Sequence, residues 1–465
     1  MRAFFIGILF FTSTLLWAQD STSVITLSEY LGYVKSFHPI VRQAHLVVNE
    51  GEIKLMKARG AFDPKFEVDY ARKKFKGTEY YDKLNAAFKI PTWYGIEFKG
   101  NFEENTGYYL DPENTVPDDG LYSVGVSISL AKGLLTNKRM ALLKQAKMFN
   151  NQAKADRQLL VNNILFDATK TYFNWLKTYN EKRVYEDFLD NAEMRFNGIK
   201  KNYEVGEAPA IDTLEARIAL NNRKLSLEKA NINYIKASLE LSNFLWLSED
   251  TPVEIRDHII PDITTNDIID QTLNTSAFDI ASLDLDNHPK MLSLDYKLQS
   301  LNIEKNLSIN NLLPTVDLQY NFLSQTPEIA RSFSTSAYKS GLNVSIPLFL
   351  RKERSDLKLA KLKILDTEFE IQNTRLALKN KIDATNQTLT SYKTQSAYLE
   401  TIVDDYQTML TAEERKFYLG ESSLFLVNSR ESKLIDAKLK AISLETDYLN
   451  TKASMSNILA LEKFE

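Results

Sequence analysis

The chain has 465 residues, of which 44% are hydrophobic and 25% charged, so its composition excludes the disordered and collagen-like classes. Its 57 basic and 61 acidic residues leave a formal net charge of −4, which gives no electrostatic sign of a nucleic-acid partner. The absence of cysteine excludes disulfides, thiol catalysis, thiolate metal sites and a lipid anchor on an N-terminal cysteine.

The first element in chain order is an apolar N-terminal run. Met1 and Arg2 precede this run from Ala3 to Leu16, and Ala18 supplies a small residue at a plausible cleavage point. We therefore predict that residues 1–18 are a signal peptide that is removed on export. A retained anchor is the alternative, but the run is shorter than the ~20 residues that cross a bilayer. No later segment offers roughly 18 uncharged apolar residues, so a mature protein embedded in a membrane requires a closed β-barrel.

The mature sequence repeats itself. The matching features are a His-Pro pair, a proline 25 positions later, an alternating segment and a glycine-containing turn. In order, these are His38–Pro39 and His288–Pro289, Pro64 and Pro314, residues 122–130 and 338–346, and residues 203–207 and 417–421. Several matches in the same order at near-equal spacing indicate an internal tandem duplication. We predict a first repeat over 19–250, and a linker segment followed by the second repeat over 251–465.

Apolar and polar residues alternate directly after each of the two later prolines. Phe66, Val68 and Tyr70 alternate with charged residues, and the segment from Val316 to Phe322 shows the same period of two. With the return segments, the pattern predicts strands within about 65–131 and about 315–349. A soluble β-sandwich would show the same alternation, so the barrel interpretation depends on the export signal.

Helical segments follow the strands in both repeats. Residues from about 134 to 203 and from about 351 to 417 contain no proline and almost no glycine, so each predicts one helix of roughly 100 Å. Shorter helices extend these pairs to about 247 and about 460. The second long helix carries a seven-residue stripe, which is typical of helices wound around one another. The stripe consists of Leu357, Ile364, Ile371, Leu378, Thr385, Tyr392, Leu399 and Tyr406.

The helix after Gly206 carries two apolar stripes instead of one. One stripe is Leu220, Leu227, Tyr234 and Leu241, and the other is Ile218, Leu225, Ile232, Leu239 and Trp246. Positions two residues apart differ by about 200° around a helix, so the stripes lie on nearly opposite sides. This arrangement predicts neighbours on both sides, as in the wall of a tube. A long antiparallel coiled-coil pair is the alternative, and it explains one stripe better than two.

Together these features resemble the TolC family of outer-membrane efflux and secretion channels over essentially the whole mature chain. The resemblance rests on the duplicated His-Pro pairs and prolines, the junctions at 129–135 and 345–350, and the turns at 203–207 and 417–421. It implies a fold of α-helices and transmembrane β-strands, in which a homotrimer shares one β-barrel that a long periplasmic α-helical barrel continues. It also implies an equatorial region of mixed structure near 248–286 and the C-terminal segment.

The resemblance implies localisation in the cell outer membrane with a periplasmic extension. The implied function is the channel subunit of a tripartite efflux pump or type I secretion system, a passive exit duct for drugs, small molecules or proteins. The implied partners are a periplasmic adaptor (membrane fusion) protein, an inner-membrane RND or ABC transporter and outer-membrane lipid. We expect no nucleic-acid partner, no cofactor or metal, and no enzymatic activity. The alternative function is an exported periplasmic coiled-coil scaffold or adaptor protein.

Two further alternating runs, Leu84–Ile90 and Ile96–Phe102, add to the strands of the first repeat. In the family each repeat supplies two strands, which makes twelve in the trimer, so these runs depart from the family pattern. They are either an added hairpin in the barrel or an elaborated surface loop. Nearby aromatic residues are candidates for an interfacial girdle, with loop or packing roles as the alternative. They are Tyr80, Tyr81, Trp93, Tyr94, Tyr108 and Tyr109.

In the family, the turns between the long and shorter helices form the periplasmic tip, where the channel closes and the adaptor docks. The corresponding residues here are Tyr203, Val205, Gly206, Glu207, Phe417, Leu419, Gly420 and Glu421. Glycine suits such a turn because it tolerates the positive φ of a helix end. A plain helical hairpin turn without a gating role is the alternative, since it would need the same glycines.

Two acidic residues are candidates for a gate in the lumen. Family members can carry acidic rings just beyond the second turn, but Leu426 and Ser429 stand at those positions here. Asp212 and Glu215 follow Gly206 in the first repeat, and threefold symmetry would convert each into a ring of three carboxylates. The alternative is that both are solvated residues near a helix N-terminus, where acidic side chains are favoured.

Catalytic chemistry finds little support in the sequence. We see no phosphate-binding glycine loop, no zinc spacing and no nucleophile and base pair. His38 and His288 each precede a proline and recur because the repeat recurs, so we interpret them as capping or packing residues instead of metal ligands.

Overall fold

A computed structural model describes residues 23–248, 251–256, 258–273, 284–328 and 333–460. The predicted signal peptide over 1–18 lies outside these residues, as does part of the predicted equatorial region. The chain divides into two compact units. Unit 1 holds the described residues of 1–41, 163–278 and 384–457, and unit 2 holds those of 42–162, 279–383 and 458–465. Each unit contains segments of both predicted repeats, whose boundaries stay a prediction.

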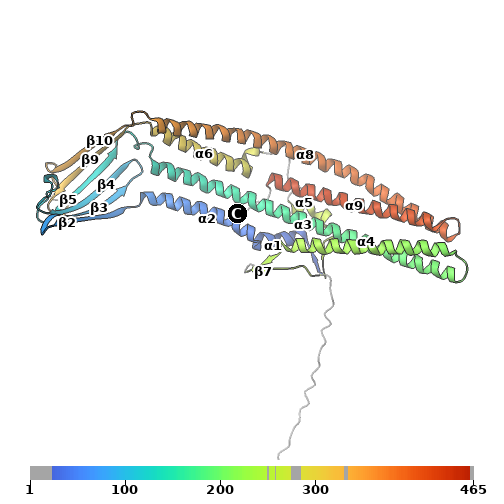
Figure 1. Ribbon diagram of the computed structural model, residues 1–465. Coiled ribbons are helices and arrows are strands. Elements are labelled where there is room, and N and C mark those ends of the chain that lie inside the picture. The colour runs from blue at the N-terminus through green and yellow to red at the C-terminus, as the bar shows by residue number, and fades with distance from the viewer. Residues whose placement is uncertain (1–22, 249–250, 257, 274–283, 329–332, 461–465) are drawn as a thin grey trace, which may run out of the picture. The chain divides into compact units, whose positions relative to one another are not determined.

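Unit 2 contains one antiparallel sheet with the strand order β10-β9-β5-β4-β3-β2 (Figure 1). Its strands are β2 (Lys65–Phe75), β3 (Thr78–Pro91), β4 (Ile96–Thr106), β5 (Leu121–Ser129), β9 (Thr315–Ser324) and β10 (Tyr338–Ser345). Lys76 and Gly77 join β2 to β3, and both have positive φ, as a two-residue hairpin turn requires. Both additional runs of the first repeat are therefore strands of this sheet, and they lie between β2 and β5.

The register places most apolar residues of the six strands on one face of the sheet. Phe66 lies opposite Phe88, which lies opposite Gly100, and Val126 lies opposite both Phe98 and Tyr320. Because side chains alternate between the two faces, most charged, amide and hydroxyl residues of the same strands lie on the other face. The alternation of apolar and polar residues in the sequence thus produces a sheet with one mainly apolar and one mainly polar face.

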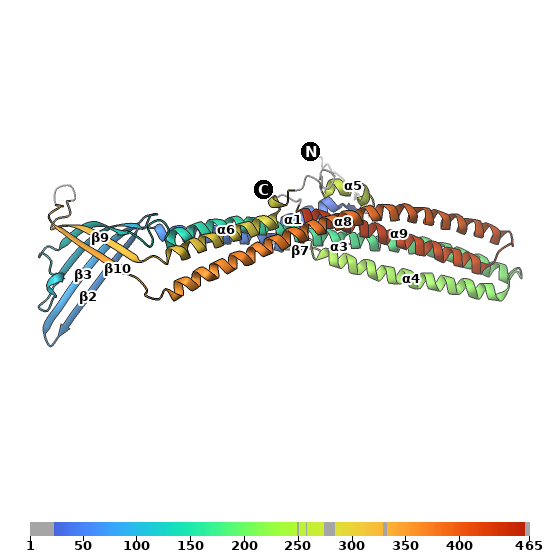
Figure 2. The same ribbon diagram turned by 90° about the horizontal axis from the view of Figure 1, so that it is seen from above.

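Four helical segments complete unit 2. They are α2 (Pro39–Arg59) from residue 42 on, α6 (Pro289–Asn310), the first part of α3 (Lys138–Glu204) and the first part of α8 (Arg351–Tyr418). Ser293 Oγ of α6 donates a hydrogen bond of 2.6 Å to Asp156 Oδ1 of α3, and Lys297 Nζ of α6 lies 2.7 Å from Glu370 Oε2 of α8. Helix α6 therefore lies between α3 and α8 (Figure 2).

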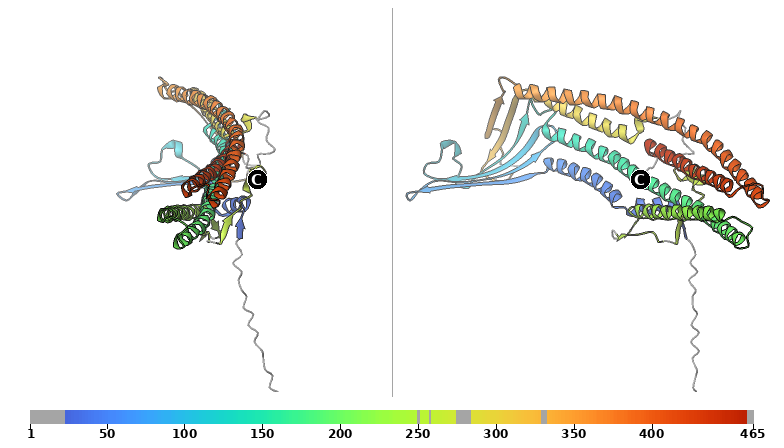
Figure 3. Two further views of the ribbon diagram at one scale, coloured as in Figure 1. Left: turned by 90° about the vertical axis from the view of Figure 1, so that its right-hand side faces the viewer. Right: turned by 45° about the vertical axis from the view of Figure 1, so that its right-hand side comes forward.

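Unit 1 is built mainly from two helical hairpins. The second part of α3 pairs with α4 (Ala210–Ser242), and the second part of α8 pairs with α9 (Leu424–Leu459) (Figure 3). Trp175 of α3 is fully buried, and its indole Nε1 donates a 3.0 Å hydrogen bond to Ser238 Oγ of α4. Helices α3 and α8 have 67 and 68 residues, which agrees with the uninterrupted helices that the sequence predicts.

Short elements complete unit 1. Strand β1 (Ser23–Ile25) is parallel to β8 (Ile259–Pro261), β6 (Trp246–Leu247) pairs with β7 (Thr251–Pro252), and α1 (Leu27–Phe37) and α5 (Thr265–Thr272) are short helices. Tyr172 of α3 donates to Ile25 O at 2.9 Å and accepts from Asp262 N at 3.1 Å, so its hydroxyl bridges β1 and β8 at the end where both strands finish. Of these elements β7, β8 and α5 fall within 248–286, the segment for which the resemblance implies mixed structure, whereas β1 and α1 come from the start of the chain.

The two stripes of α4 have different environments. Leu220 and Leu241 are buried, whereas Ile218, Leu225 and Leu239 on the opposite side are more than half exposed. The seven-residue stripe of α8 lies on the less exposed side of that helix throughout. None of the helices in the described residues combines the length and apolar composition that a membrane crossing requires.

Candidate functional site

The two helical hairpins of unit 1 end in turns of the same geometry. Gly206 has a φ of 85° and Gly420 a φ of 77°. In the first turn, Gly206 N donates to Tyr203 O at 3.0 Å and Glu207 N donates to Asn202 O at 2.8 Å. The second turn repeats this pair of bonds, from Gly420 N to Phe417 O and from Glu421 N to Lys416 O. Both turns are therefore Schellman motifs, in which a glycine ends the helix and the last carbonyls are satisfied.

The predicted tip residues differ in exposure. Val205 and Leu419 stand next to the glycines and are about two-thirds exposed, at 65% and 67%. Tyr203 is also exposed, whereas Phe417 packs inward against two separate hydrophobic clusters. One of these clusters joins Ile199 of α3, Ala216 of α4 and Leu424 of α9. The sequence-predicted residues of both turns therefore lie at the same end of unit 1, with apolar side chains projecting from it.

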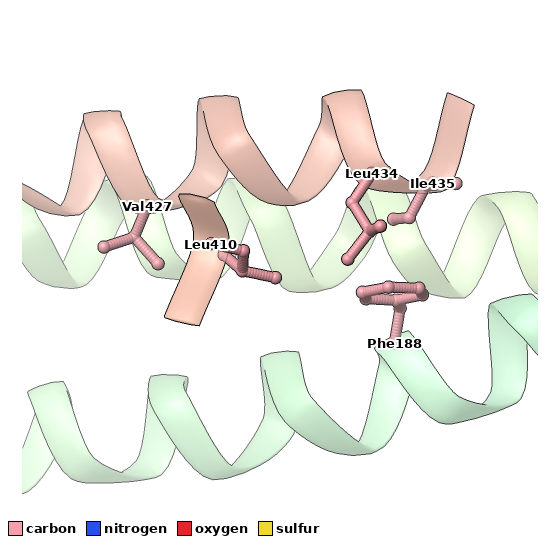
Figure 4. Packing of buried hydrophobic residues seen from close by; sticks show 5 residues of the cluster. All are labelled: Phe188, Leu410, Val427, Leu434 and Ile435. Atoms are coloured by element: carbon pink, nitrogen blue, oxygen red, sulfur yellow. The ribbon is translucent and has the colours of Figure 1, made fainter. Parts of the chain in front are cut away.

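A second hydrophobic cluster packs behind the turns. Figure 4 shows Phe188 of α3 facing Leu434 and Ile435 of α9, with Leu410 of α8 and Val427 of α9 beside them. All five side chains are at most 4% exposed. The burial of these side chains holds the α3–α4 and α8–α9 hairpins together, because apolar area removed from water contributes roughly 25 cal/mol per Å².

An ionic cluster of Arg195, Arg223, Glu414 and Glu431 lies beside this apolar core. Glu431 of α9 is only 2% exposed, and its Oε2 lies 2.6 Å from Arg195 Nη1 of α3. Its other oxygen, Oε1, accepts a 3.1 Å hydrogen bond from Arg223 Nε of α4. One buried carboxylate therefore joins two guanidinium groups from different helices.

Further contacts extend the ionic cluster to the fourth helix. Arg195 Nη2 lies 3.2 Å from Glu414 Oε1 of α8, and Arg195 Nη1 donates to Asn428 Oδ1 at 3.2 Å. Asn428 Nδ2 in turn donates to Glu215 Oε1 of α4 at 3.4 Å. The cluster thus connects all four helices of the two hairpins through charged hydrogen bonds, which are stronger than neutral ones.

The two proposed gate residues occupy different environments. Asp212 lies in the first turn of α4 and is partly exposed. This environment also agrees with the alternative, in which Asp212 is a solvated residue near a helix N-terminus. Glu215, one turn further on, is also partly exposed but accepts the hydrogen bond from Asn428. Glu215 is therefore linked to the ionic cluster, which ties its side chain to α9.

Sequence reasoning did not identify the ionic cluster. The sequence feature that could have indicated it is a charged residue within an apolar stripe. Four residues follow one face of α9 and are all buried, namely Leu424, Val427, Glu431 and Leu434. A carboxylate at such a position must have a charged or hydrogen-bonding partner, since an unpaired buried charge is very costly. Its two arginine partners lie more than 200 residues earlier in the chain.

The two His-Pro pairs cap helices. His288 Nδ1 accepts a 3.1 Å hydrogen bond from Lys290 N at the start of α6, and its Nε2 lies 2.9 Å from Ile458 O. His38 Nδ1 accepts in the same way from Ile40 N at 3.2 Å, and its ring stacks on Phe244. The capping and packing interpretation is therefore confirmed for both histidines. Among the described residues, no group of three or more His, Asp or Glu could hold a metal ion.

Burial lowers the pKa of both imidazoles. The folded-state pKa therefore lies below that of the unfolded chain, which is about 6.5. The contribution of these histidines to the stability of the fold is fully present above about pH 6.5, and it is lost as the pH falls through the folded-state pKa. We expect the melting temperature of the wild type to drop more between about pH 7 and about pH 5 than that of the His38→Asn/His288→Asn variant, since asparagine caps helices without titrating. His45→Asn, at an exposed position, is the control, and equal slopes for all three proteins would contradict the prediction.

Comparison with known proteins gives a family match in the second half of the chain. Residues 280–461 match the family model described as outer membrane efflux protein. No curated protein matches the chain in sequence.

Several solved outer-membrane channels have a similar fold. The Campylobacter jejuni CmeC outer membrane channel matches with a TM-score of 0.65 and 14% identity, covering 99% of this chain and 94% of that one. The Neisseria gonorrhoeae MtrE outer membrane channel in its open state matches at 0.65 and 12% identity, covering 93% and 88%. Vibrio cholerae VceC, an outer membrane protein, matches at 0.64 and 10% identity, covering 93% and 96%. Residues 280–461 therefore match the outer membrane efflux protein family, and the chain has the TolC-like fold of these outer-membrane channels.

Proposed function

We propose that this protein is an outer-membrane channel subunit, the passive exit duct of a tripartite efflux pump or type I secretion system. The observation that carries the proposal is the sheet of unit 2, whose apolar face is exposed while the other face is polar. Phe66, Phe98 and Leu342 on the apolar face are more than half exposed. A water-soluble protein rarely leaves so continuous an apolar surface uncovered, whereas lipid chains would cover it.

The lengths of the strands also support a membrane location. The six strands have 8 to 14 residues, close to the 9–11 that a tilted strand needs to cross the bilayer. The polar face would then line water, as in the lumen of an outer-membrane channel. The proposed cargo (drugs, small molecules or proteins) would pass along this lumen, and partner proteins would supply the energy.

Assembly into a homotrimer is part of the proposal. Strands β2 and β10 are the two edges of the sheet, and a free edge in lipid would leave a row of peptide groups unpaired. The exposed stripe of α4, which includes Ile218 and Leu225, offers a second surface that another copy would cover. Because the two sheet edges are different strands, their pairing between copies would be head-to-tail, and such contacts close into a ring when the rotation between copies allows it.

The tip of the helical hairpins is the proposed closing end and docking site. Exposed Val205 and Leu419 on the two similar turns give this end an apolar surface that suits a periplasmic adaptor (membrane fusion) protein. An inner-membrane RND or ABC transporter would complete the assembly. Asp212 and Glu215, just behind the first turn, are the proposed lumen gate.

Reconstitution tests the proposed function. Detergent-extracted protein added to a planar lipid bilayer should give stepwise ion conductance, and its mass in detergent should be that of three chains. A soluble monomer without conductance would overturn the proposal and favour a periplasmic coiled-coil scaffold.

The gate residues make a separate prediction. Replacing Asp212 with Asn and Glu215 with Gln should reduce the preference of the channel for cations over anions, because rings of carboxylates attract cations at a constriction. Reversal potentials in a salt gradient measure this preference. Glu186→Gln serves as the control, because this partly exposed carboxylate on α3 forms only an ion pair of 3.5 Å with Lys182 of the same helix. An unchanged reversal potential in the double variant would remove the gating role.

A further inference from the structure

The β3–β4 hairpin is present in only one of the two repeats. In the first repeat the chain forms β2, β3, β4 and β5 before it enters α3, whereas the described residues of the second repeat between α6 and α8 form β9 and β10 alone. The sheet nevertheless accepts the additional pair at its centre, because β3 pairs with β2 and β4 pairs with β5 over long antiparallel stretches. The hairpin is thus an insertion into the sheet and is continuous with the duplicated strands.

The hairpin continues the apolar face without interruption. Phe88 of β3 lies opposite Phe66 of β2, and Phe98 of β4 lies opposite Val126 of β5. These pairs place the hairpin's apolar side chains in the same rows as those of the duplicated strands. The apolar side chains of the hairpin on this face are Leu84, Ala86, Phe88, Ile90, Ile96, Phe98 and Phe102, and Asp82 and Glu104 lie on it nearer the β2–β3 turn.

The opposite face of the hairpin is as polar as that of its neighbours. Lys89 Nζ of β3 lies 2.5 Å from Glu67 Oε2 of β2, and Lys99 and Glu97 of β4 form an ion pair of 3.5 Å. Asn101 shares this face and lies opposite Ser123 of β5. A surface loop has no need for two chemically distinct faces in register with a neighbouring sheet, but a membrane wall between lipid and water requires them.

Aromatic side chains stand at both ends of the hairpin. At the end beside the β2–β3 turn, the rings of Tyr80 and Tyr109 lie 4.7 Å apart, and Tyr109 N donates to Tyr80 O at 3.0 Å. At the helix end, Trp93 stacks on Phe62 with ring centroids 5.6 Å apart. Aromatic residues above and below an apolar band are typical of the two membrane interfaces.

We infer that the β3–β4 hairpin is embedded in the outer membrane as part of the channel wall, so that each subunit contributes six strands instead of four. The inference rests on the proposed function. Three subunits of six strands make a wall of eighteen, compared with the twelve strands that two per repeat would supply. Because barrel diameter grows roughly linearly with strand number, the outer mouth would be about one and a half times as wide. The edges remain compatible, since β2 and β10 run in opposite directions and would pair antiparallel between copies.

Single cysteines can test this inference because the natural chain has none. Phe98→Cys on the apolar face and Asn101→Cys on the polar face probe the hairpin, and Leu318→Cys and Gln319→Cys probe the two faces of β9 in the same way. Each variant carries a nitrobenzoxadiazole fluorophore in vesicles that contain phospholipids spin-labelled along the acyl chain. We expect the fluorophores at 98 and 318 to lose most of their fluorescence to the lipid quencher, and those at 101 and 319 to be quenched by aqueous iodide instead.

The possible outcomes separate this inference from the proposed function. If position 318 is quenched by lipid but position 98 only by iodide, the hairpin lies outside the membrane, and the channel function stands without it. If neither 318 nor 98 is quenched by lipid, the proposed membrane location itself fails. Phe88→Cys on β3 repeats the measurement if Phe98→Cys does not assemble, since both side chains are exposed on the same face.

Discussion

Glu431→Ala is expected to destabilise unit 1 by about 3–5 kcal/mol, the loss measured when one partner of a buried ion pair is removed. The carboxylate is 2% exposed and contacts both Arg195 and Arg223, whose side chains are only 12% and 13% exposed. Its removal would leave two guanidinium groups close together without their shared anion. We expect the helical hairpins to separate at a lower temperature, which thermal unfolding followed by far-UV circular dichroism would measure.

An exposed ion pair between two of the same helices provides the control. Lys224 of α4 and Glu193 of α3 lie 3.1 Å apart, and both side chains are about half exposed. Glu193→Ala should cost less than about 1 kcal/mol, because exposed pairs contribute little. If both variants lose the same small amount of stability, the ionic cluster does not hold the hairpins together. Glu431→Gln should fall between the two, since an amide retains one acceptor for the arginines.

Gly125→Ala is expected to disrupt the sheet where the two repeats meet. Gly125 of β5 lies opposite Asn321 of β9, and an added Cβ would stand 2.6 Å from Asn321 Cα and closer still to Tyr320 O. These are backbone atoms, which cannot move without separating the strands. Overpacking of this kind costs about 1–3 kcal/mol in ordinary cores, and here it opens the pairing of β5 with β9, which joins the strands of the two repeats in the six-stranded sheet.

The duplication supplies a matched control for this substitution. Gly341 occupies the equivalent position of the second repeat, in β10, and an added Cβ there would meet no atom within 4 Å. Gly341→Ala should therefore preserve the heat-resistant oligomer on a denaturing gel, whereas Gly125→Ala should remove most of it. Equal oligomer yields from the two variants would show that the close approach of β5 and β9 does not limit assembly.

Much of this architecture could be predicted from local patterns. Alternation after Pro64 and Pro314 predicts β2 and β9, and the lack of proline and glycine predicts α3 and α8, because each of these signals repeats within a single segment. Gly206 and Gly420 mark the ends of the two long helices for the same reason. The residues of the candidate tip could therefore be predicted from the sequence, although its docking role stays a prediction.

Pairing between distant segments was not predictable in this way. The sequence left the runs at 84–90 and 96–102 as either a wall hairpin or a loop, and only the register of β3 and β4 decides between a strand pair in the sheet and a loop. A period of two describes one strand and its two faces, but it does not say which strand lies beside it.

The ionic cluster shows the same limit for helices. The periodicity of α9 indicates which face is buried, but a carboxylate at position 431 is stable there only because Arg195 and Arg223 approach it from two other helices. The sequence by itself thus determined the elements, their order and their duplication, since these depend on interactions within a few residues. The tertiary structure decided strand order, the close approach at Gly125 and the partners of Glu431, because each depends on which surfaces meet in space.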